Sequence, residues 1–85
     1  MPIIELPSIA TDEEIDEFLK RVGNNIKNIR VSNRVSQFEL ALTIGQKGSS
    51  LIANAENYTK GKRFNLEHLY KISKALDCDI RDFFV

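Results

Sequence analysis

The chain has few of the residues that build reactive or cross-linked sites: one cysteine, one histidine and no tryptophan in 85 residues. The single cysteine, Cys78, has no partner for an intrachain disulfide and no neighbouring thiol with which to bind a metal. His68 stands alone, without a serine or cysteine nucleophile arranged around it. We therefore expect no enzyme, no catalytic residue, no metal site and no cofactor.

Long apolar segments are also lacking. No run approaches the roughly 18 residues of a membrane span, and no charged-then-apolar leader with a small-residue cleavage site is present. These features predict a cytoplasmic protein without a membrane partner. A chain of 85 residues is one small domain, which buries only about two thirds of its unfolded surface and gains stability if it oligomerises.

The net charge is zero, with 12 basic and 12 acidic residues, and this balance by itself argues against a nucleic-acid partner. The two signs are segregated along the chain, however. Residues 1–19 carry six acids and no lysine or arginine, whereas residues 20–85 hold all 12 basic residues and the other six acids, a balance of +6. A basic body with an acidic extension is compatible with binding to phosphates.

The first third of the chain predicts one long helix over residues 12–32. Thr11 and Glu14 match a capping box, and the acids that follow favour a first helical turn. Gly23 is expected to weaken or break the helix, and Asn33 is expected to close it in a left-handed conformation. One apolar face is formed at alternating spacings of four and three by Ile15, Leu19, Val22, Ile26 and Ile29.

The segment 36–56 predicts two short helices joined by a tight turn. Ser36 and Glu39 match a second capping box. Gly45 stands where a helix ends in a left-handed residue, and Gly48 and Ser49 both suit the cap of a new helix. Such a unit can place its second helix in a DNA major groove. The expected helices cover 36–44 and 49–57, with Leu40, Ala41 and Ile44 of the first and Leu51, Ile52 and Ala55 of the second facing inward.

Two more helices are expected towards the C-terminus. Asn65 is predicted to cap a helix with Leu66, Leu69, Ile72 and Leu76 inside. Asp79 is predicted to cap a short fifth helix that carries Ile80, Phe83 and Phe84. Since no strand pattern and no repeat appear, the fold class is expected to be all-α with five helices.

The segment 36–56 resembles the helix-turn-helix of phage Cro and repressor proteins and of their bacterial relatives, the XRE-type regulators. Those sequences read roughly Ser/Thr-Gln-x-x-Leu-Ala, then Gly, then an apolar-containing recognition helix that ends in Glu. The matching residues are Ser36, Gln37, Leu40, Ala41, Gly45 and Glu56. The resemblance implies a lambda-repressor-like domain over 22–85. It leaves residues 1–21 as an acidic N-terminal extension, extended over 1–10 and helical from about 12.

The turn departs from the family pattern. Aligning Glu56 with the family's glutamate requires one extra residue in the turn, and then Ala55 faces inward and Asn54 outward. Without that insertion Leu51 fits its apolar position, but Asn54 falls where an apolar residue is expected. We favour the insertion.

The resemblance also implies which residues meet DNA. Small polar side chains near the start of the recognition helix can bond to base edges, and alanine can touch a thymine methyl group. A basic loop after that helix is expected to neutralise phosphates. Gln37, at a helix N-terminus, is expected to contact a phosphate and to buttress the recognition helix. The expected DNA-binding residues are Gln37, Lys47, Ser49, Ser50, Ala53, Asn54, Asn57, Lys60, Lys62 and Arg63, with Arg34 as a weaker candidate. The alternative for each is an ordinary solvated surface residue.

An ion pair is expected to support the recognition helix. In the repressors that this chain resembles, an arginine of the first helix pairs with the glutamate that ends the recognition helix. Arg30 lies six residues before Ser36, as the family pattern requires. We therefore expect a partly buried pair between Arg30 and Glu56 that fixes the recognition helix against the first helix.

Several apolar residues are expected at the surface or under a covering segment. Those at the start of the long helix pack onto their own domain or meet a second subunit. A pair in the second helix is covered by the N-terminal segment or binds a protein partner. The last residues of the chain are candidates for a dimer interface. The candidate partner and dimer surface comprises Ile15, Leu19, Phe38, Leu42, Phe84 and Val85.

We expect a sequence-specific transcriptional regulator, with a preference for a repressor, that reads a pseudo-palindromic operator on double-stranded DNA as a homodimer. The alternative is a protein-interaction module or antitoxin-like partner-binding protein on the same fold. Three features favour that alternative: the insertion in the turn, the arginine-poor recognition helix and the zero net charge. In a further version, the acidic segment 12–17 covers the basic face and inhibits DNA binding.

Overall fold

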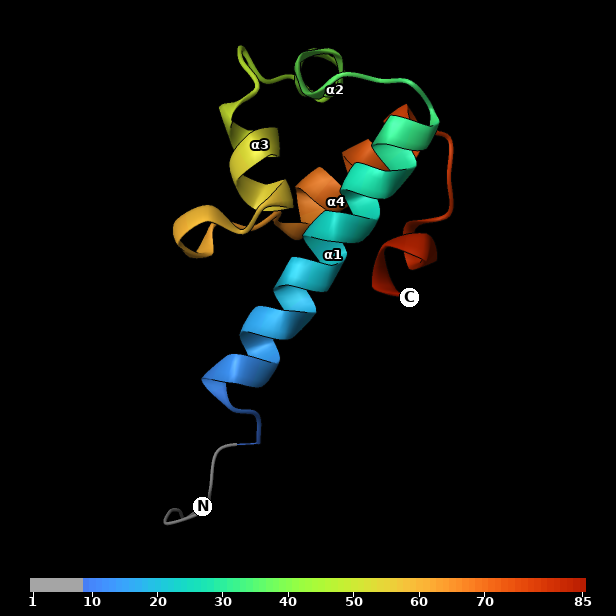
Figure 1. Ribbon diagram of the computed structural model, residues 1–85. Helices are drawn as coiled ribbons and strands as arrows, with labels where there is room; N and C mark the ends of the chain where they lie inside the picture. The colour runs from blue at the N-terminus through green and yellow to red at the C-terminus, as the bar shows by residue number, and fades with distance from the viewer. Residues whose placement is uncertain (1–8) are drawn as a thin grey trace.

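The computed structural model describes residues 9–85, so most of the segment expected to be extended over residues 1–10 lies outside the described residues. The described chain is all-α, as expected, and residues 9–85 contain no strand (Figure 1). The expected count of five α-helices is not confirmed, because Asp79 caps a 3-10 helix instead of an α-helix. The elements are α1 (Asp12–Ser32), α2 (Gln37–Thr43), α3 (Ser50–Glu56), η1 (Thr59–Gly61), α4 (Leu66–Ala75) and η2 (Ile80–Phe84).

α1 is one helix of 21 residues that passes through Gly23 without a break. Its start carries the expected capping box: the Glu14 backbone N–H donates to Thr11 Oγ1 (3.1 Å), and the Thr11 N–H donates to the Glu14 carboxylate (2.7 Å). Its end differs from expectation. Asn33 has a φ of −90° and donates its amide to a carbonyl in the last turn of α1, so the left-handed residue is Arg34, at φ 58°.

The core takes a large buried side chain from each α-helix and from η2. α1 packs along α3 and η2, while α2 packs against α3 and α4. α2 and α3 have seven residues each, fewer than the roughly 12–15 that an isolated helix needs in water. Packing on the shared core therefore stabilises the helix-turn-helix. The largest fully buried side chains are Ile26, Leu40, Ile52, Ile72 and Phe83.

Gly23 marks the closest approach of α1 to α3. A Cβ at this position would lie 2.6 Å from the carbonyl oxygen of Ala55 and 2.9 Å from that of Glu56. Both atoms belong to the backbone at the end of α3, so they cannot rotate away as a side chain can. The residue expected to weaken α1 is thus the one that allows α3 to sit directly against it.

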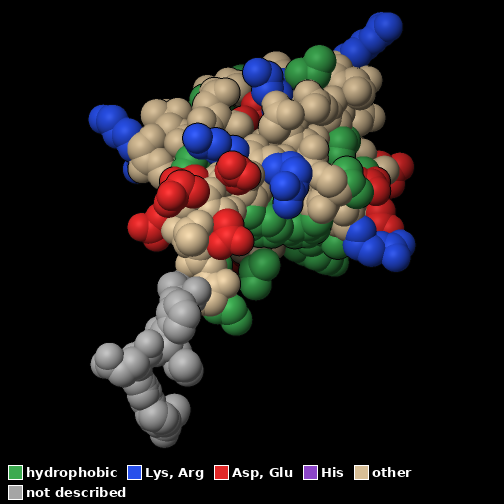
Figure 2. All heavy atoms as spheres, turned by 60° about the horizontal axis from the view of Figure 1, so that its bottom comes forward, with side chains coloured by type: hydrophobic (Ala, Val, Ile, Leu, Met, Phe, Trp, Pro, Cys, Tyr) green, Lys and Arg blue, Asp and Glu red, His purple; other side chains and the backbone are tan. Residues whose placement is uncertain are grey.

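Some apolar residues lie outside this core. The inward placement expected for Leu66 is wrong: it begins α4 at the edge of the core and is 82% exposed, whereas Leu69 and Ile72 are buried. The first turns of α1 project beyond the other elements (Figure 1). Figure 2 shows hydrophobic side chains gathered on the face of the molecule near that end.

Candidate nucleic-acid interface

The outward face of α3 carries four of the residues expected to meet DNA. Ser50, Ala53, Asn54 and Asn57 follow one another at i, i+3, i+4 and i+7, which places them on one side of a helix. Ser50 and Asn57 are exposed, and Ala53 and Asn54 are half-buried. Ala55 is buried on the opposite side, with 2% of its surface exposed. This is the register, with Ala55 inward and Asn54 outward, that the extra turn residue predicts.

A buried network ties α3 to the two preceding helices. The Arg30 guanidinium donates to both carboxylate oxygens of Glu56, through Nε at 2.7 Å and through Nη2 at 3.0 Å. Its third nitrogen, Nη1, donates to the backbone oxygen of Val35 (2.8 Å), and the Gln37 side-chain amide donates to Glu56 Oε1 (3.2 Å). The expected ion pair is therefore present, with side-chain exposures of 8% for Arg30 and 0% for Glu56.

The start of α2 is fixed by its own cap. The Ser36 backbone N–H donates to the Glu39 carboxylate (2.8 Å), and the Glu39 N–H donates to Ser36 Oγ (3.0 Å). The Ser36 backbone hydrogen bond lowers the pKa of the Glu39 carboxyl below its ordinary value. Gly45 ends the helix at a φ of 90°. Gln37 thus lies between a closed capping box and Glu56, which limits its side chain to the side of α2 that faces α3.

The beginning and the end of α3 offer different polar groups. Ser49 precedes the helix as its N-cap residue, but its hydroxyl makes no capping hydrogen bond. Lys47 is exposed in the turn before it. Asn57, at the other end, donates its side-chain amide to the Ala53 backbone oxygen (2.9 Å). Because this amide group already donates to the backbone of α3, Asn57 has fewer hydrogen-bonding groups available for a base than Ser49 or Asn54.

The loop after α3 separates its basic residues into two groups. Lys60 and Lys62 are exposed. Arg63 instead folds back: its Nη2 donates to the Tyr58 hydroxyl (3.3 Å), and its guanidinium carbon lies 5.6 Å from the centre of the Tyr58 ring. The Tyr58 hydroxyl in turn donates to Asp16 of α1 (2.7 Å). The structure therefore directs Arg63 towards α1. No local pattern pairs residues 42 positions apart, so sequence reasoning missed this link.

The lysines of the expected interface form no ion pair within residues 9–85. The three ion pairs of that range are Arg30–Glu56, Lys71–Glu67 and Arg81–Asp79. The positive charges of Lys47, Lys60 and Lys62 are thus not neutralised by these residues. Such charges bind phosphates by releasing counterions from DNA.

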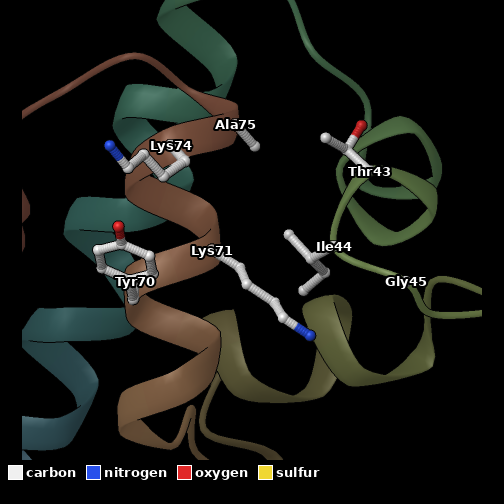
Figure 3. Close-up of a pocket in the computed structure, with 7 residues that line it drawn as sticks. All are labelled: Thr43, Ile44, Gly45, Tyr70, Lys71, Lys74 and Ala75. Atoms are coloured by element: carbon white, nitrogen blue, oxygen red, sulfur yellow. The ribbon is translucent and has the colours of Figure 1, made fainter.

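An open groove lies between the end of α2 and α4, with a volume of about 510 Å³. Figure 3 shows Lys71 reaching from α4 into this groove. Lys71 is already paired with Glu67 (2.9 Å), and Lys74 lies over the Tyr70 ring (5.6 Å). None of the residues expected to bind DNA lines the groove, which comprises Thr43, Ile44, Gly45, Tyr70, Lys71, Lys74 and Ala75.

The apolar residues expected at a partner surface fall into two separate places. Phe38 and Leu42 lie on α2 and remain 53% and 51% exposed, so the other described residues do not cover them. Ile15, Leu19 and Phe84 lie near one another around the first half of α1, where they line adjoining cavities with Phe18. Val85, at the end of the chain, is 78% exposed.

Residues 9–85 form neither a metal-binding cluster nor a membrane-spanning helix. No group of three or more histidine, cysteine, aspartate or glutamate residues there is placed to hold a metal ion. None of the helices in this range combines the length and the apolar character needed to cross a bilayer.

The short α2, the turn at Gly45 and the supported outward face of α3 define a helix-turn-helix protein. A family model for the Cro/C1-type HTH DNA-binding domain matches residues 25–85, and the chain belongs to that family. The match begins within α1, so residues 12–24, which form the first half of that helix, lie outside it. A comparison with curated proteins gave no match.

Proposed function

We propose that this protein is a sequence-specific transcriptional regulator in the cytoplasm, acting as a repressor, that places α3 in the major groove of double-stranded DNA. The observation that carries the proposal is the supported outward face of α3. Ser50, Ala53 and Asn54 lie on that face, while the buried Arg30–Glu56 pair holds the opposite side. A rigid helix with small polar residues outward can approach base edges closely.

Each group of residues has a distinct role in this proposal. Asn54 reads a base, because an asparagine amide can bond to adenine through two hydrogen bonds. Lys47, Lys60 and Lys62 meet phosphates and set the register of the protein on the duplex without reading sequence. Gln37 keeps α3 in place through Glu56 and lies where a phosphate can reach it. A homodimer would present two copies of α3 to the two halves of a pseudo-palindromic operator.

Selection from a pool of random duplexes, repeated at two salt concentrations, tests the proposal. We expect enrichment of one palindromic site, with affinity that falls steeply as salt rises. Asn54→Ala should lose about 1–3 kcal/mol on the best site and relax one base position, whereas Lys62→Ala should weaken all sites alike and reduce the salt slope by about one. Asn24→Ala, on the exposed side of α1, and Lys74→Ala, on α4, are the matched controls. If no site is enriched and binding stays weak at low salt, the proposal is wrong.

A second candidate function is binding of a protein partner on the same fold. The observation that favours it is the exposure of Phe38 and Leu42, which stand four residues apart on α2 and form one apolar patch. In that case Phe38→Ser should abolish capture of the partner and leave DNA selection unchanged. The reverse result, with DNA selection lost and capture of the partner retained in Phe38→Ser, would eliminate this candidate.

A further inference from the structure

The loop that carries Lys60 and Lys62 has an unusual backbone. This segment, here called the η1 loop, spans residues 58–63 and contains η1. Tyr58 and Lys60 both have a φ of 53°, a left-handed conformation in which the Cβ of an L-residue crowds a carbonyl oxygen. Gly61 follows at a φ of 75°, which glycine adopts without that crowding. Two non-glycine residues in this conformation persist only where the surrounding structure holds them.

The backbone hydrogen bonds of the η1 loop close the turn but do not orient it. The Gly61 N–H donates to the Tyr58 carbonyl oxygen (3.2 Å), and the Lys62 N–H donates to the Thr59 carbonyl oxygen (3.0 Å). Each of these bonds joins residues three positions apart, within the loop itself. The position of the loop relative to the helices therefore depends on side chains that reach beyond it.

The Tyr58 side chain reaches from the η1 loop to α1. Its hydroxyl donates to the Asp16 carboxylate (2.7 Å) and accepts from Arg63 Nη2 (3.3 Å). The donor order is fixed, because an ionised carboxylate only accepts and a guanidinium only donates. Arg63 also donates from Nε to the Gly61 carbonyl oxygen (3.1 Å), and its guanidinium lies over the Tyr58 ring. Tyr58 and Arg63 thus connect both ends of the loop to Asp16.

The residue that anchors the loop lies outside the matched domain. The family model begins at residue 25, whereas Asp16 belongs to the first half of α1 and precedes Tyr58 by 42 positions. Asp16 also carries a negative charge, which by itself repels DNA. Any contribution of Asp16 that favours DNA binding must therefore act through the residues that it holds.

We propose that Asp16 and Tyr58 are positioning residues of the DNA interface, which hold the η1 loop in the conformation that presents Lys60 and Lys62 to phosphates. Neither Asp16 nor Tyr58 touches DNA in this arrangement, and both act through the two exposed lysines. The effect on DNA binding rests on the proposed function, whereas the hold on the loop can be measured without DNA. The half of α1 that precedes the matched domain thereby becomes part of the site.

Amide hydrogen exchange, followed by NMR without DNA, tests the hold on the loop. Tyr58→Phe removes only the hydroxyl and keeps the aromatic ring, and Asp16→Ala removes the acceptor. In both variants the Gly61 and Lys62 amides should lose protection by about tenfold, because the loop opens locally, and the amide of the buried Ile72 should keep its protection. Loop amides protected as in the wild type would overturn the proposal. An equal loss at Ile72 would also overturn it, because the variants would then act on the whole fold.

Removal of the Asp16 charge has opposite effects under positioning and under electrostatics alone. By charge alone, Asp16→Ala should strengthen binding to DNA. We expect weaker binding instead, with the Kd for the selected duplex raised about fivefold in both Asp16→Ala and Tyr58→Phe. Glu17→Ala is the matched control, because it removes the same charge from the exposed neighbouring residue, and its Kd should equal or fall below that of the wild type. Weaker binding in Tyr58→Phe without weaker binding in Asp16→Ala would overturn the role of Asp16.

A double-variant cycle tests whether Tyr58 acts through the lysines. In the wild type, Lys60→Ala should weaken binding and reduce the salt slope by about one. In Tyr58→Phe the loop no longer holds Lys60 at a phosphate, so the same substitution should change the Kd by less than about twofold. Equal losses in the two backgrounds would overturn the proposal.

The two proposals fail in different ways. A wild type that enriches a site, with the same Kd in Tyr58→Phe and Asp16→Ala, would refute the positioning role and leave the proposed function standing. A wild type that enriches no site would refute the proposed function and the role of the loop in DNA binding. The exchange measurement would still report whether Asp16 and Tyr58 hold the loop.

Discussion

Replacing Glu56 by glutamine removes the charge from the buried pair and keeps the size of the side chain. The Glu56 side chain is fully buried, and that of Arg30 is 8% exposed. The guanidinium would therefore remain in the interior without a counter-charge. Removing one partner of such a pair costs about 3–5 kcal/mol. Since the glutamine oxygen can still accept one hydrogen bond, we expect about 3 kcal/mol, the lower end of that range.

The loss should be measured as a free energy of unfolding in urea, followed by far-UV CD. In a domain of this size about 3 kcal/mol corresponds to a fall in Tm of about 12–24 °C. Glu67→Gln is the matched control, because Glu67 pairs with Lys71 at the surface with side-chain exposures of 73% and 45%. That change should cost far less than Glu56→Gln, because water and salt screen an ion pair at the surface.

A double variant separates burial of charge from loss of packing. Arg30→Met combined with Glu56→Leu fills the same space with apolar atoms and removes both charges, so it should recover most of the stability lost in Glu56→Gln. Recognition of DNA should not recover, because Gln37 would lose the carboxylate to which it donates. If Glu56→Gln costs no more than Glu67→Gln, the reasoning that Glu56 compensates a buried charge is refuted.

Three further predictions concern individual contacts. In Gly23→Ala the added Cβ meets backbone oxygens of α3, so the substitution should lose about 1–3 kcal/mol in urea unfolding; a gain, usual for glycine-to-alanine changes in helices, would contradict the close approach. The Arg81 side chain donates to Asp79 and lowers the pKa of that carboxyl from 3.8 to about 2. The ionised Asp79 carboxylate therefore stabilises the fold fully at pH values above its pKa in the unfolded chain, and this stabilisation is lost as pH falls through about 2. The difference in unfolding free energy between wild type and Asp79→Asn should shrink from pH 5 to pH 2. A difference that stays constant over this range would argue against the Arg81–Asp79 contact. The hydrogen bond from Tyr58 to Asp16 raises the pKa of the phenol above its ordinary value of 10.0. The hydrogen bond therefore stabilises the fold at any pH below 10.0, and this stabilisation is lost as pH rises through the raised pKa. Ultraviolet titration should show one of the two tyrosines ionising late, and Tyr58→Phe should remove that late step; simultaneous ionisation of both would contradict the contact.

The helices themselves follow from local sequence. Both expected capping boxes, at Thr11 and at Ser36, are present, and each joins residues only three positions apart. The left-handed turn at Gly45 is likewise decided by one residue. The Arg30–Glu56 pair came from resemblance to a family, because no local rule connects residues 26 positions apart.

The sequence predicted those parts of the candidate site that depend on residues close together in the chain. The placement of Asn54 outward and Ala55 inward follows from helical spacing once the turn is aligned. Helical spacing does not predict the hydrogen bond from Asn57 to the Ala53 backbone or the one from Arg63 to Tyr58. A side chain with several donors bonds to whichever acceptor the folded chain brings near it.

The sequence by itself determined the helix starts, the turn and the apolar faces, because these depend on residues within one or two helical turns of one another. Only the tertiary structure decided that Gly23 lets α3 approach α1 and that Leu66 lies outside the core. The same holds for Asp16, which reaches Tyr58 across the molecule. Each of these depends on the distance between elements remote in sequence, and that distance is set when all the helices pack on one core.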